Sequence, residues 1–306
     1  MEAKWIWMLV TAIAPLAWGS TYYITNAVLP PGEPLWGAVI RALPAGVLLY
    51  VVRRRRPRGA WWWRSAVLGV LNTGGFFALV YAAAQLLPSS IASTLMATSP
   101  LAMMGFGRLF LAERPRLLAL IGAVIGAIGV TVMLWGGGTG VHPLGILASL
   151  AAMLLSSIGY VLATRWSDGV DVFSSTSWQL LAGGLIVVPF ALVVEGAPPH
   201  LDAAALAGFA YVTVIATAVA FIAWFSGLRH LGAGTVGLIG LLNPVAGVVL
   251  GTVVAGETLG LRQGVGLAIV LGGILLGQSA RASRKSRVGA KNVVPVAAVE
   301  KSRMRS

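Results

Sequence analysis

The 306-residue sequence contains no cysteine and only three histidines. Without cysteine, the chain can form neither disulfides nor thiolate metal sites. The histidines stand far apart, at predicted helix ends or in loops, so a histidine metal cluster is not expected; they are His142, His200 and His230. We therefore predict no metal site and no cofactor.

Acidic residues are also scarce, and charged residues of both signs make up only 10% of the chain. No carboxylate falls within the core of a predicted helix, where a proton-coupled pump commonly carries one. The sequence also has no carboxylate pair, no phosphate-binding loop and no recognisable Ser-His-Asp set. We predict no catalytic residues, and transport without an intramembrane acid that relays protons.

Apolar and small residues are present in excess. Hydrophobic residues make up 58% of the chain, and the mean hydropathy is +0.87. A soluble protein of this length cannot bury so much apolar surface. The 39 glycines are about twice the usual ~7% share, and small residues let membrane helices approach closely. The sequence therefore predicts a protein whose solvent is lipid.

Ten apolar stretches are each about as long as a bilayer-spanning helix requires. They are residues 5–27, 35–52, 62–82, 89–111, 117–135, 143–165, 172–194, 203–227, 233–255 and 261–280. The first stretch is expected to be retained, because no A-x-A type cleavage site follows it. The predicted fold class is an all-α polytopic membrane protein with ten transmembrane helices.

The net charge of +13 is better explained by membrane topology than by nucleic-acid binding. With ten alternating spans, nearly all arginine-rich connections fall on one side of the membrane, together with the basic tail; Arg262 is the exception. The positive-inside rule then makes both termini cytoplasmic. Residues 281–306 are predicted to be a basic, disordered tail drawn to anionic lipid.

An internal repeat organises the chain. Pro100 stands 13 residues before Glu113, and Pro244 stands 13 residues before Glu257. The two prolines are 144 residues apart, close to half the chain length. A repeated apolar helix that is broken by proline and ends in glutamate indicates an internally duplicated membrane protein.

The repeat divides the chain into two predicted halves, residues 1–139 and 140–280. Each half holds five predicted spans. Because five is odd, the second half inserts upside down relative to the first. Inverted repeats around a central cavity are typical of alternating-access transporters, and a duplicated channel is the alternative.

Four features together resemble the EamA-type ten-helix branch of the drug/metabolite transporter superfamily. They are Trp18-Gly19-Ser20-Thr21, Arg41, the segment from Pro100 to Arg114 and the segment from Pro244 to Glu257. The resemblance covers residues 5–280, and within the branch the chain is most similar to YddG-type exporters of aromatic amino acids. It implies a central cavity lined by the first, third, fourth, sixth, eighth and ninth helices, rocking second and seventh helices, and export from the cytoplasm.

The predicted cavity lining is apolar and aromatic, with hydroxyls and amides but few charges. Such a lining suits a zwitterion with a bulky apolar side chain and does not suit a sugar phosphate. Packing between rings would recognise an aromatic substrate. The predicted substrate-binding residues are Trp18, Tyr22, Asn72, Phe76, Tyr81, Thr98, Ser99, Tyr160 and Asn243.

A second group of residues is predicted to act in gating or in structure. Arg41 is a cation inside a predicted span, where it contacts a substrate carboxylate or a gate, or packs against backbone carbonyls. Pro100 and Pro244 each free a carbonyl four residues earlier, which binds an ammonium or water or only permits a hinge. Glu113 and Glu257 cap neighbouring helices or close gates through ion pairs.

The sequence as a whole predicts a bacterial inner-membrane exporter of aromatic or hydrophobic amino acids that works by alternating access. Its partners are the small-molecule substrate and the lipid bilayer, and nucleic acid is not among them. The alternatives are a multidrug or quaternary-cation efflux transporter and a passive metabolite channel. Glycine motifs beginning at Gly122 and Gly273 are compatible with a monomer or a homodimer.

Overall fold

The computed structural model describes residues 2–28, 32–87, 95–135, 142–167, 169–254 and 260–279. Within these ranges the secondary structure is helical, without a β-strand. In chain order the helices are α1 (Glu2–Val28), α2 (Pro34–Arg53), α3 (Trp61–Gly69), η1 (Val70–Gly74), α4 (Gly75–Leu86), α6 (Ser99–Leu111), α7 (Leu117–Leu134), α8 (Pro143–Arg165), α9 (Val172–Val194), α10 (Ala203–Thr213), η2 (Val214–Val219), α11 (Ala220–Leu231), α12 (Ala233–Gly240), α13 (Leu242–Val254) and α14 (Leu261–Ser279). Glu257 and the predicted tail lie outside the described residues.

Each of the ten predicted apolar stretches coincides, where it is described, with one helix or with a run of consecutive helices. Some are long and apolar enough to cross a membrane: Pro34–Arg53, Trp61–Ala83, Pro143–Arg165, Val172–Val194 and Ala203–Leu231. Shorter apolar helices are Leu117–Val132, Ala233–Gly247 and Leu261–Gly277. The architecture is that of an all-helical, polytopic membrane protein.

Local sequence signals explain where several helices begin and end. Pro34 and Pro143 open α2 and α8, where the missing proline N–H leaves no intrahelical bond unmade. Asp171 caps α9 by accepting from Ser174 N at 3.0 Å. Arg54 ends α2 in the left-handed region, with φ of 51°, which is a common way to close a helix.

Two long helical segments contain π-helices at matched positions. The third predicted stretch is built from α3, η1 and α4, and the eighth from α10, η2 and α11. The π-helix η1 begins at Val70 and η2 begins at Val214, which repeats the 144-residue spacing of Pro100 and Pro244. A π-helix widens one turn and disturbs the regular hydrogen-bond ladder, often at functional positions.

The repeated prolines sit after helix breaks and not at their centres. The helix α6 begins at Ser99, so Pro100 lies in its first turn. In the second copy, α12 ends at Gly240 and α13 begins at Leu242, just before Pro244. Proline is favoured in the first turn of a helix and costly in the interior. The predicted helix breaks are present, and they lie just N-terminal to the two prolines.

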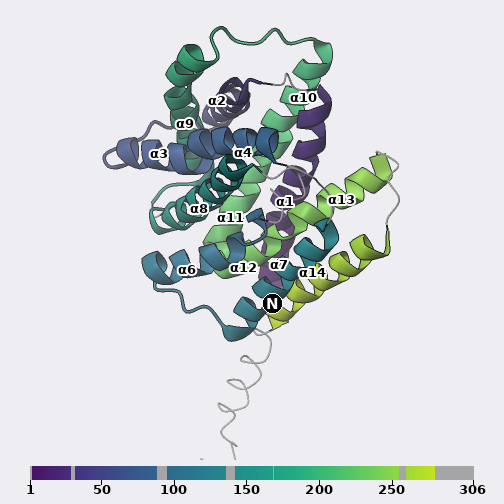
Figure 1. The fold of residues 1–306 in the computed structure, drawn as a ribbon. Coiled ribbons are helices and arrows are strands. Elements are labelled where there is room, and N and C mark those ends of the chain that lie inside the picture. The colour runs from purple at the N-terminus through teal and green to yellow at the C-terminus, as the bar shows by residue number, and fades with distance from the viewer. Residues whose placement is uncertain are drawn as a thin grey trace, which may run out of the picture.

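Pairs of helices from the two halves of the chain pack on each other in reciprocal fashion. The helix α2 packs against α9, and α7 packs against α14, which lie side by side in Figure 1. A Cβ built at Gly46 would lie 2.8 Å from Leu181 Cγ, and one at Gly184 would lie 2.6 Å from Leu43 Cγ. Each glycine thus receives a leucine from the opposite helix, and 138 residues separate both the two glycines and the two leucines.

The α7 and α14 pair repeats this reciprocity with the 144-residue spacing. A Cβ built at Gly129 would lie 2.7 Å from Val270 N, and one at Gly273 would lie 2.8 Å from Gly126 N. Small residues bring these two backbones close together, as they do in membrane helix pairs. The glycine motifs of α7 and α14 therefore serve packing within the chain.

Candidate functional site

Aromatic side chains from α1, α4, α8 and α11 meet in the centre of the bundle. This aromatic cluster consists of Trp18, Phe77, Tyr160, Phe221, Trp224 and Phe225. The ring centre of Trp224 lies 5.1 Å from that of Trp18 and 5.4 Å from that of Tyr160. Edge-to-face and tilted pairs at such distances are favourable beyond the area they bury. The cluster forms a dense apolar core where the first and second halves of the chain meet.

Arg41 on α2 caps the aromatic cluster with a buried positive charge. Its guanidinium carbon lies 4.2 Å from the centre of the Phe77 ring, a cation–π distance. Arg41 Nε donates to Thr217 Oγ1 at 2.7 Å, and Nη2 donates to the Ala216 carbonyl at 3.0 Å. Trp18 Nε1 donates to the same carbonyl at 2.9 Å. The π-helix η2 thus provides the acceptor that ties α1 and α2 together.

A second polar network joins α9 to the other π-helix. Asn72 Nδ2 donates to Gln179 Oε1 at 2.8 Å, and Thr73 Oγ1 donates to the Gln179 carbonyl at 3.1 Å. All three residues are buried. Among the described residues, Asn72 Oδ1 has no hydrogen-bond partner. A Cβ built at Gly159 would lie 2.0 Å from this oxygen, so Asn72 faces α8.

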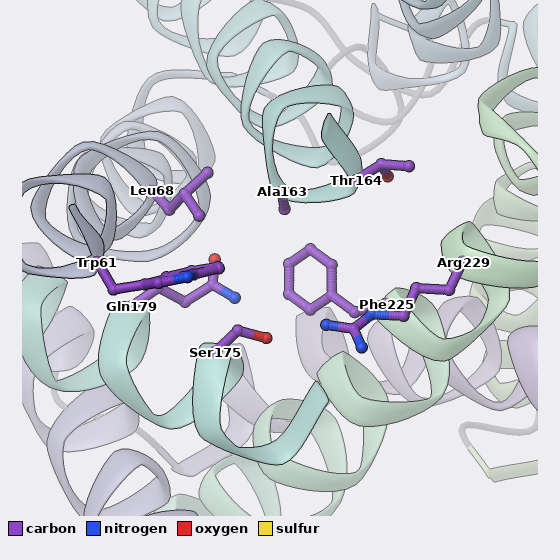
Figure 2. Close-up of a pocket in the computed structure, with 8 residues that line it drawn as sticks. All are labelled: Trp61, Leu68, Ala163, Thr164, Ser175, Gln179, Phe225 and Arg229. Atoms are coloured by element: carbon purple, nitrogen blue, oxygen red, sulfur yellow. The ribbon is translucent and has the colours of Figure 1, made fainter. Parts of the chain in front are cut away.

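A pocket opens beside this second network, where the ends of α3, α8, α9 and α11 converge (Figure 2). Its lining residues are Trp61, Leu68, Ala163, Thr164, Ser175, Gln179, Phe225 and Arg229. We call it the Arg229 pocket. Its cavity volume is about 10 Å³, roughly the space that one water molecule needs. A ligand larger than water would therefore enter only after neighbouring side chains move.

The ends of the α2 and α9 pair are fixed by acidic residues. Glu195 accepts from the backbone N–H of Leu35 at 2.8 Å and of Trp36 at 2.9 Å, which caps α2. At the opposite end, Asp171 lies 3.7 Å from Arg53 Nε and 3.5 Å from Arg55 Nη1.

Asp171 lies just before α9, outside the apolar segments, and its surroundings change the pKa of its carboxyl group. Burial opposes its charge, but hydrogen bonds from Ser174 and the nearby Arg53 and Arg55 outweigh it and hold the pKa of Asp171 below its usual value. Asp171 is therefore ionised at neutral pH. Within the described part of the chain, no group of three or more His, Cys, Asp or Glu residues could hold a metal ion.

The structure brings some of the predicted substrate-binding residues together. Trp18 and Tyr160 belong to the aromatic cluster, and Phe76 lies beside it with its ring centre 5.7 Å from that of Phe77. Tyr81 packs against the same core. Asn72 lies in the Gln179 network, and the side chain of Tyr22 lies outside the described residues.

Thr98, Ser99 and Asn243 lie at the helix breaks and do not belong to the aromatic cluster. Thr98 Oγ1 donates to Leu95 O at 2.6 Å in its own segment. The Asn243 carbonyl faces Gly19, where a built Cβ would lie 2.6 Å from the oxygen. The contact of these residues with substrate stays a prediction.

Glu113 and the repeated prolines make contacts between helices. Glu113 Oε1 accepts from Ala233 N at 3.5 Å, at the start of α12. Pro100 packs on the same helix, because a Cβ built at Gly237 would lie 3.0 Å from Pro100 Cα. This geometry matches the capping interpretation of Glu113, while its role in gating stays a prediction.

The predicted binding set omitted Phe77, Gln179, Phe221, Trp224 and Phe225. A signal for three of them was present in the sequence, since Phe221, Trp224 and Phe225 follow the i, i+3, i+4 spacing of one helix face. The same face continues to Arg229, four residues after Phe225. Their contacts with α1 and α8 depend on packing between distant segments.

Comparison with known proteins agrees with this architecture. The EamA-like transporter family matches residues 5–135 and 143–277. Protein PecM of Dickeya dadantii is 32% identical over 267 residues, which are 87% of this chain and 90% of PecM. The uncharacterized inner membrane transporter YedA of Escherichia coli K12 is 26% identical, over 85% of this chain and 87% of YedA.

A solved crystal structure shares the fold. It superimposes with a TM-score of 0.77 at 20% identity and covers 90% of this chain and 98% of the other. At this identity the likeness concerns the fold alone. The family match to most of the chain is decisive for its class: the chain belongs to the EamA-like transporter family and is a membrane transporter.

Proposed function

We propose that this transporter exports aromatic or other hydrophobic amino acids from the cytoplasm. The observation that carries the proposal is the buried aromatic cluster at the junction of the two halves of the chain. Rings from both halves meet there, with Trp18 and Trp224 5.1 Å apart. Insertion of an aromatic side chain between such rings would exchange one ring contact for another at low cost.

The polar groups around the aromatic cluster suit a zwitterion. Among the described residues, the buried Trp224 Nε1 has no hydrogen-bond partner, so it is a donor available to a carboxylate. Asn72 Oδ1 is likewise buried and without a partner among these residues, so it is an acceptor available to an ammonium. One buried donor and one buried acceptor gain most from a ligand that satisfies both.

The mechanism that we propose is alternating access by two inverted five-helix repeats, residues 1–139 and 140–280, with ten transmembrane helices. Its support is the reciprocal packing of α2 with α9 and of α7 with α14, and the matched π-helices η1 and η2. The family match also falls into two consecutive segments near these boundaries. Pro100, Pro244, Glu113 and Glu257 are proposed to act where these halves move.

The proposed location is the bacterial inner membrane, with both termini in the cytoplasm. The arginines that follow α2 are the strongest orientation signal. The relative YedA is named as an inner membrane transporter, which supports the same location here. In this orientation the Arg229 pocket faces the cytoplasm and Arg41 lies toward the outer surface.

Aromatic rings also favour the alternative, an efflux transporter for quaternary cations, because cations bind ring faces. Arg41 argues against it. Its guanidinium already occupies the face of Phe77 at 4.2 Å, and a fixed positive charge at the aromatic cluster repels a cationic substrate. A passive channel is the other alternative, and it differs from a carrier in its kinetics.

Uptake into proteoliposomes tests the proposal. Labelled phenylalanine is expected to accumulate saturably, to show trans-stimulation and to be displaced by tryptophan, tyrosine and leucine. Trp224→Ala is expected to reduce uptake at least about tenfold, while the matched control Trp135→Ala, at an exposed helix end, leaves it unchanged. Linear uptake would indicate a channel, and displacement by quaternary cations but not by amino acids would favour the efflux alternative.

A further inference from the structure

The Arg229 pocket is built from helix ends on one side of the bundle. Trp61 is the first residue of α3, Ser175 lies in the first turn of α9 and Arg229 lies in the last turn of α11. Figure 2 shows Arg229 extending inward toward Phe225, with the Ser175 hydroxyl on the same side of the pocket. This is the side that the loop arginines assign to the cytoplasm.

The lining combines a cation with hydroxyls, an amide and aromatic rings. The two hydroxyls donate to backbone carbonyls, Ser175 to Asp171 O and Val172 O and Thr164 to Tyr160 O. The cation is therefore the group in the lining that suits a carboxylate, because guanidinium–carboxylate pairs are strong and directional. The rings of Trp61 and Phe225 offer an apolar surface next to it. A monocarboxylate that bears an aromatic or aliphatic side chain matches both parts of the lining.

The pocket shares its inner wall with the aromatic cluster. Phe225 lines the pocket, and its ring centre lies 5.8 Å from that of Tyr160 and 5.7 Å from that of Phe221. Gln179 also lines the pocket and bonds to Asn72 behind it. A ligand held by Arg229 would therefore be separated from the proposed central site by the Phe225 ring.

The position at the other end of the bundle that corresponds to the Arg229 pocket is filled by a side chain. The spacing that pairs Gly46 with Gly184 also pairs Gly37 with Ser175, and the 144-residue spacing pairs Tyr81 with Phe225. A Cβ built at Gly37 would lie 3.2 Å from Tyr81 Cζ, so this ring rests directly on the α2 backbone. The serine and the phenylalanine at the pocket thus replace a tight glycine–tyrosine contact.

We propose that the Arg229 pocket is a cytoplasmic recognition site for the substrate carboxylate, used before the substrate passes Phe225. Arg229 binds the carboxylate, and the side chain of the substrate lies against Trp61 and Phe225. Movement of the Phe225 ring then connects the pocket with the aromatic cluster. This inference rests on the proposed export of amino acids.

The test compares an amino acid with its amide, which lacks the negative charge. Everted membrane vesicles, whose cytoplasmic face is outside, take up labelled phenylalanine in the presence of unlabelled phenylalanine or phenylalaninamide. The wild-type protein is expected to prefer the acid by about tenfold or more, the ratio that one charge-assisted hydrogen bond provides. Arg229→Gln is expected to reduce this preference to about twofold or less, and Arg229→Lys to retain part of it.

Arg165→Gln is the matched control, because it removes the same charge from an exposed residue at the end of α8 that does not line the pocket. It is expected to keep the wild-type preference. If Arg229→Gln is inactive in transport, binding of labelled phenylalanine to the purified variant is measured with the same two competitors. Loss of the preference there supports the proposal, and an unchanged preference overturns it.

The outcomes separate this inference from the proposed function. Suppose that the wild-type protein takes up phenylalanine and prefers the acid, and that this preference is kept in Arg229→Gln but lost in Arg41→Gln. That result overturns the pocket assignment and leaves amino acid export intact. Absence of amino acid uptake by the wild-type protein overturns both.

Discussion

Arg41 and Gln179 hold matched places in the two halves of the chain, yet they form networks of different chemistry. Each lies seven residues after the first residue of its helix, α2 or α9, and each binds the π-helix of the opposite half. Arg41 joins η2 through a charge and lies on the ring of Phe77. Gln179 joins η1 through neutral amide and hydroxyl groups.

The charged Arg41 network and the neutral Gln179 network also differ in how tightly the residues around them are packed. Around Arg41, a buried charge-assisted bond to Thr217 and a partly buried indole bond from Trp18 meet at η2, and the Tyr81 ring packs against Gly37 nearby. Around Gln179, the Arg229 pocket remains. In the proposed orientation, we infer that the charged network holds the outer end closed and that the neutral network leaves the cytoplasmic end easier to open.

The largest loss of stability is expected when the side chains at positions 41 and 179 are exchanged. Gln179→Arg places a cation among buried neutral groups and is expected to cost about 3–5 kcal/mol of unfolding free energy. The reciprocal Arg41→Gln loses charge-assisted bonds without burying a new charge, so about 2 kcal/mol is expected. Equilibrium unfolding in detergent micelles measures both. Equal losses in the two variants would show that the networks are chemically interchangeable.

The next largest loss of stability is expected where η1 packs closely against α9. A Cβ built at Gly183 would lie 2.5 Å from Gly69 O and 2.0 Å from Thr73 Oγ1, whereas the matched position on α2 already carries Ala45. Gly183→Ala is expected to destabilise the protein by about 2–3 kcal/mol through overpacking.

Gly105→Ala provides the control for this substitution, because a Cβ there meets nothing within 4 Å. It is expected to be neutral or slightly stabilising, since alanine favours helix. Unfolding curves recorded under the same conditions compare the two variants. A Gly183→Ala protein with wild-type stability would mean that η1 and α9 are no closer than η2 and α2.

Two tryptophans of the aromatic cluster distinguish structural from substrate-binding roles. Trp18→Phe removes the bond to the Ala216 carbonyl and is expected to cost about 1 kcal/mol. Trp224→Phe removes no hydrogen bond seen among the described residues, so its cost in stability is smaller, while the KM for phenylalanine is expected to rise severalfold. Thermal unfolding and uptake kinetics are measured side by side. The reverse pattern would assign the structural role to Trp224.

Some of these features could be predicted from the sequence, and others could not. The positions of Pro100 and Pro244 were sufficient to predict the helix breaks, because proline acts locally on the backbone. The π-helices had no such local signal, and the hydrogen bonds that join them to Arg41 and Gln179 link segments far apart in the sequence. Trp18 and Tyr160 were predicted as binding residues because they stood out in apolar stretches. Phe221 and Arg229 were not, since a buried ring and a loop cation resemble ordinary packing and topology signals.

The smallest effect is expected at the link between α2 and α9. The pKa of Asp171 lies below its usual value, so its ionised form stabilises the fold. This contribution is fully present above the unfolded pKa of about 4 and is lost as the pH falls through the lower, folded pKa. Asp171→Asn is expected to cost less than about 1 kcal/mol at pH 7, because the pair is partly exposed.

Unfolding free energies of the wild type and Asp171→Asn, measured from pH 7 down to pH 3, test this link. The difference between the two proteins is expected to shrink in the acidic part of the range. A difference that persists unchanged at pH 3 would show that the Asp171 charge does not stabilise the packing of α2 against α9.

The central claim, alternating access between two matched ends, is tested most directly by labelling single cysteines in a chain that has none of its own. Ser175→Cys marks the Arg229 pocket, and Tyr81→Cys marks the position matched to Phe225 at the other end. A membrane-impermeant thiol reagent is expected to reach Ser175→Cys only from the cytoplasmic face and Tyr81→Cys only from the outer face, with phenylalanine changing the two rates in opposite directions. Labelling of both cysteines from one face, or a rise of both rates together, would contradict the account.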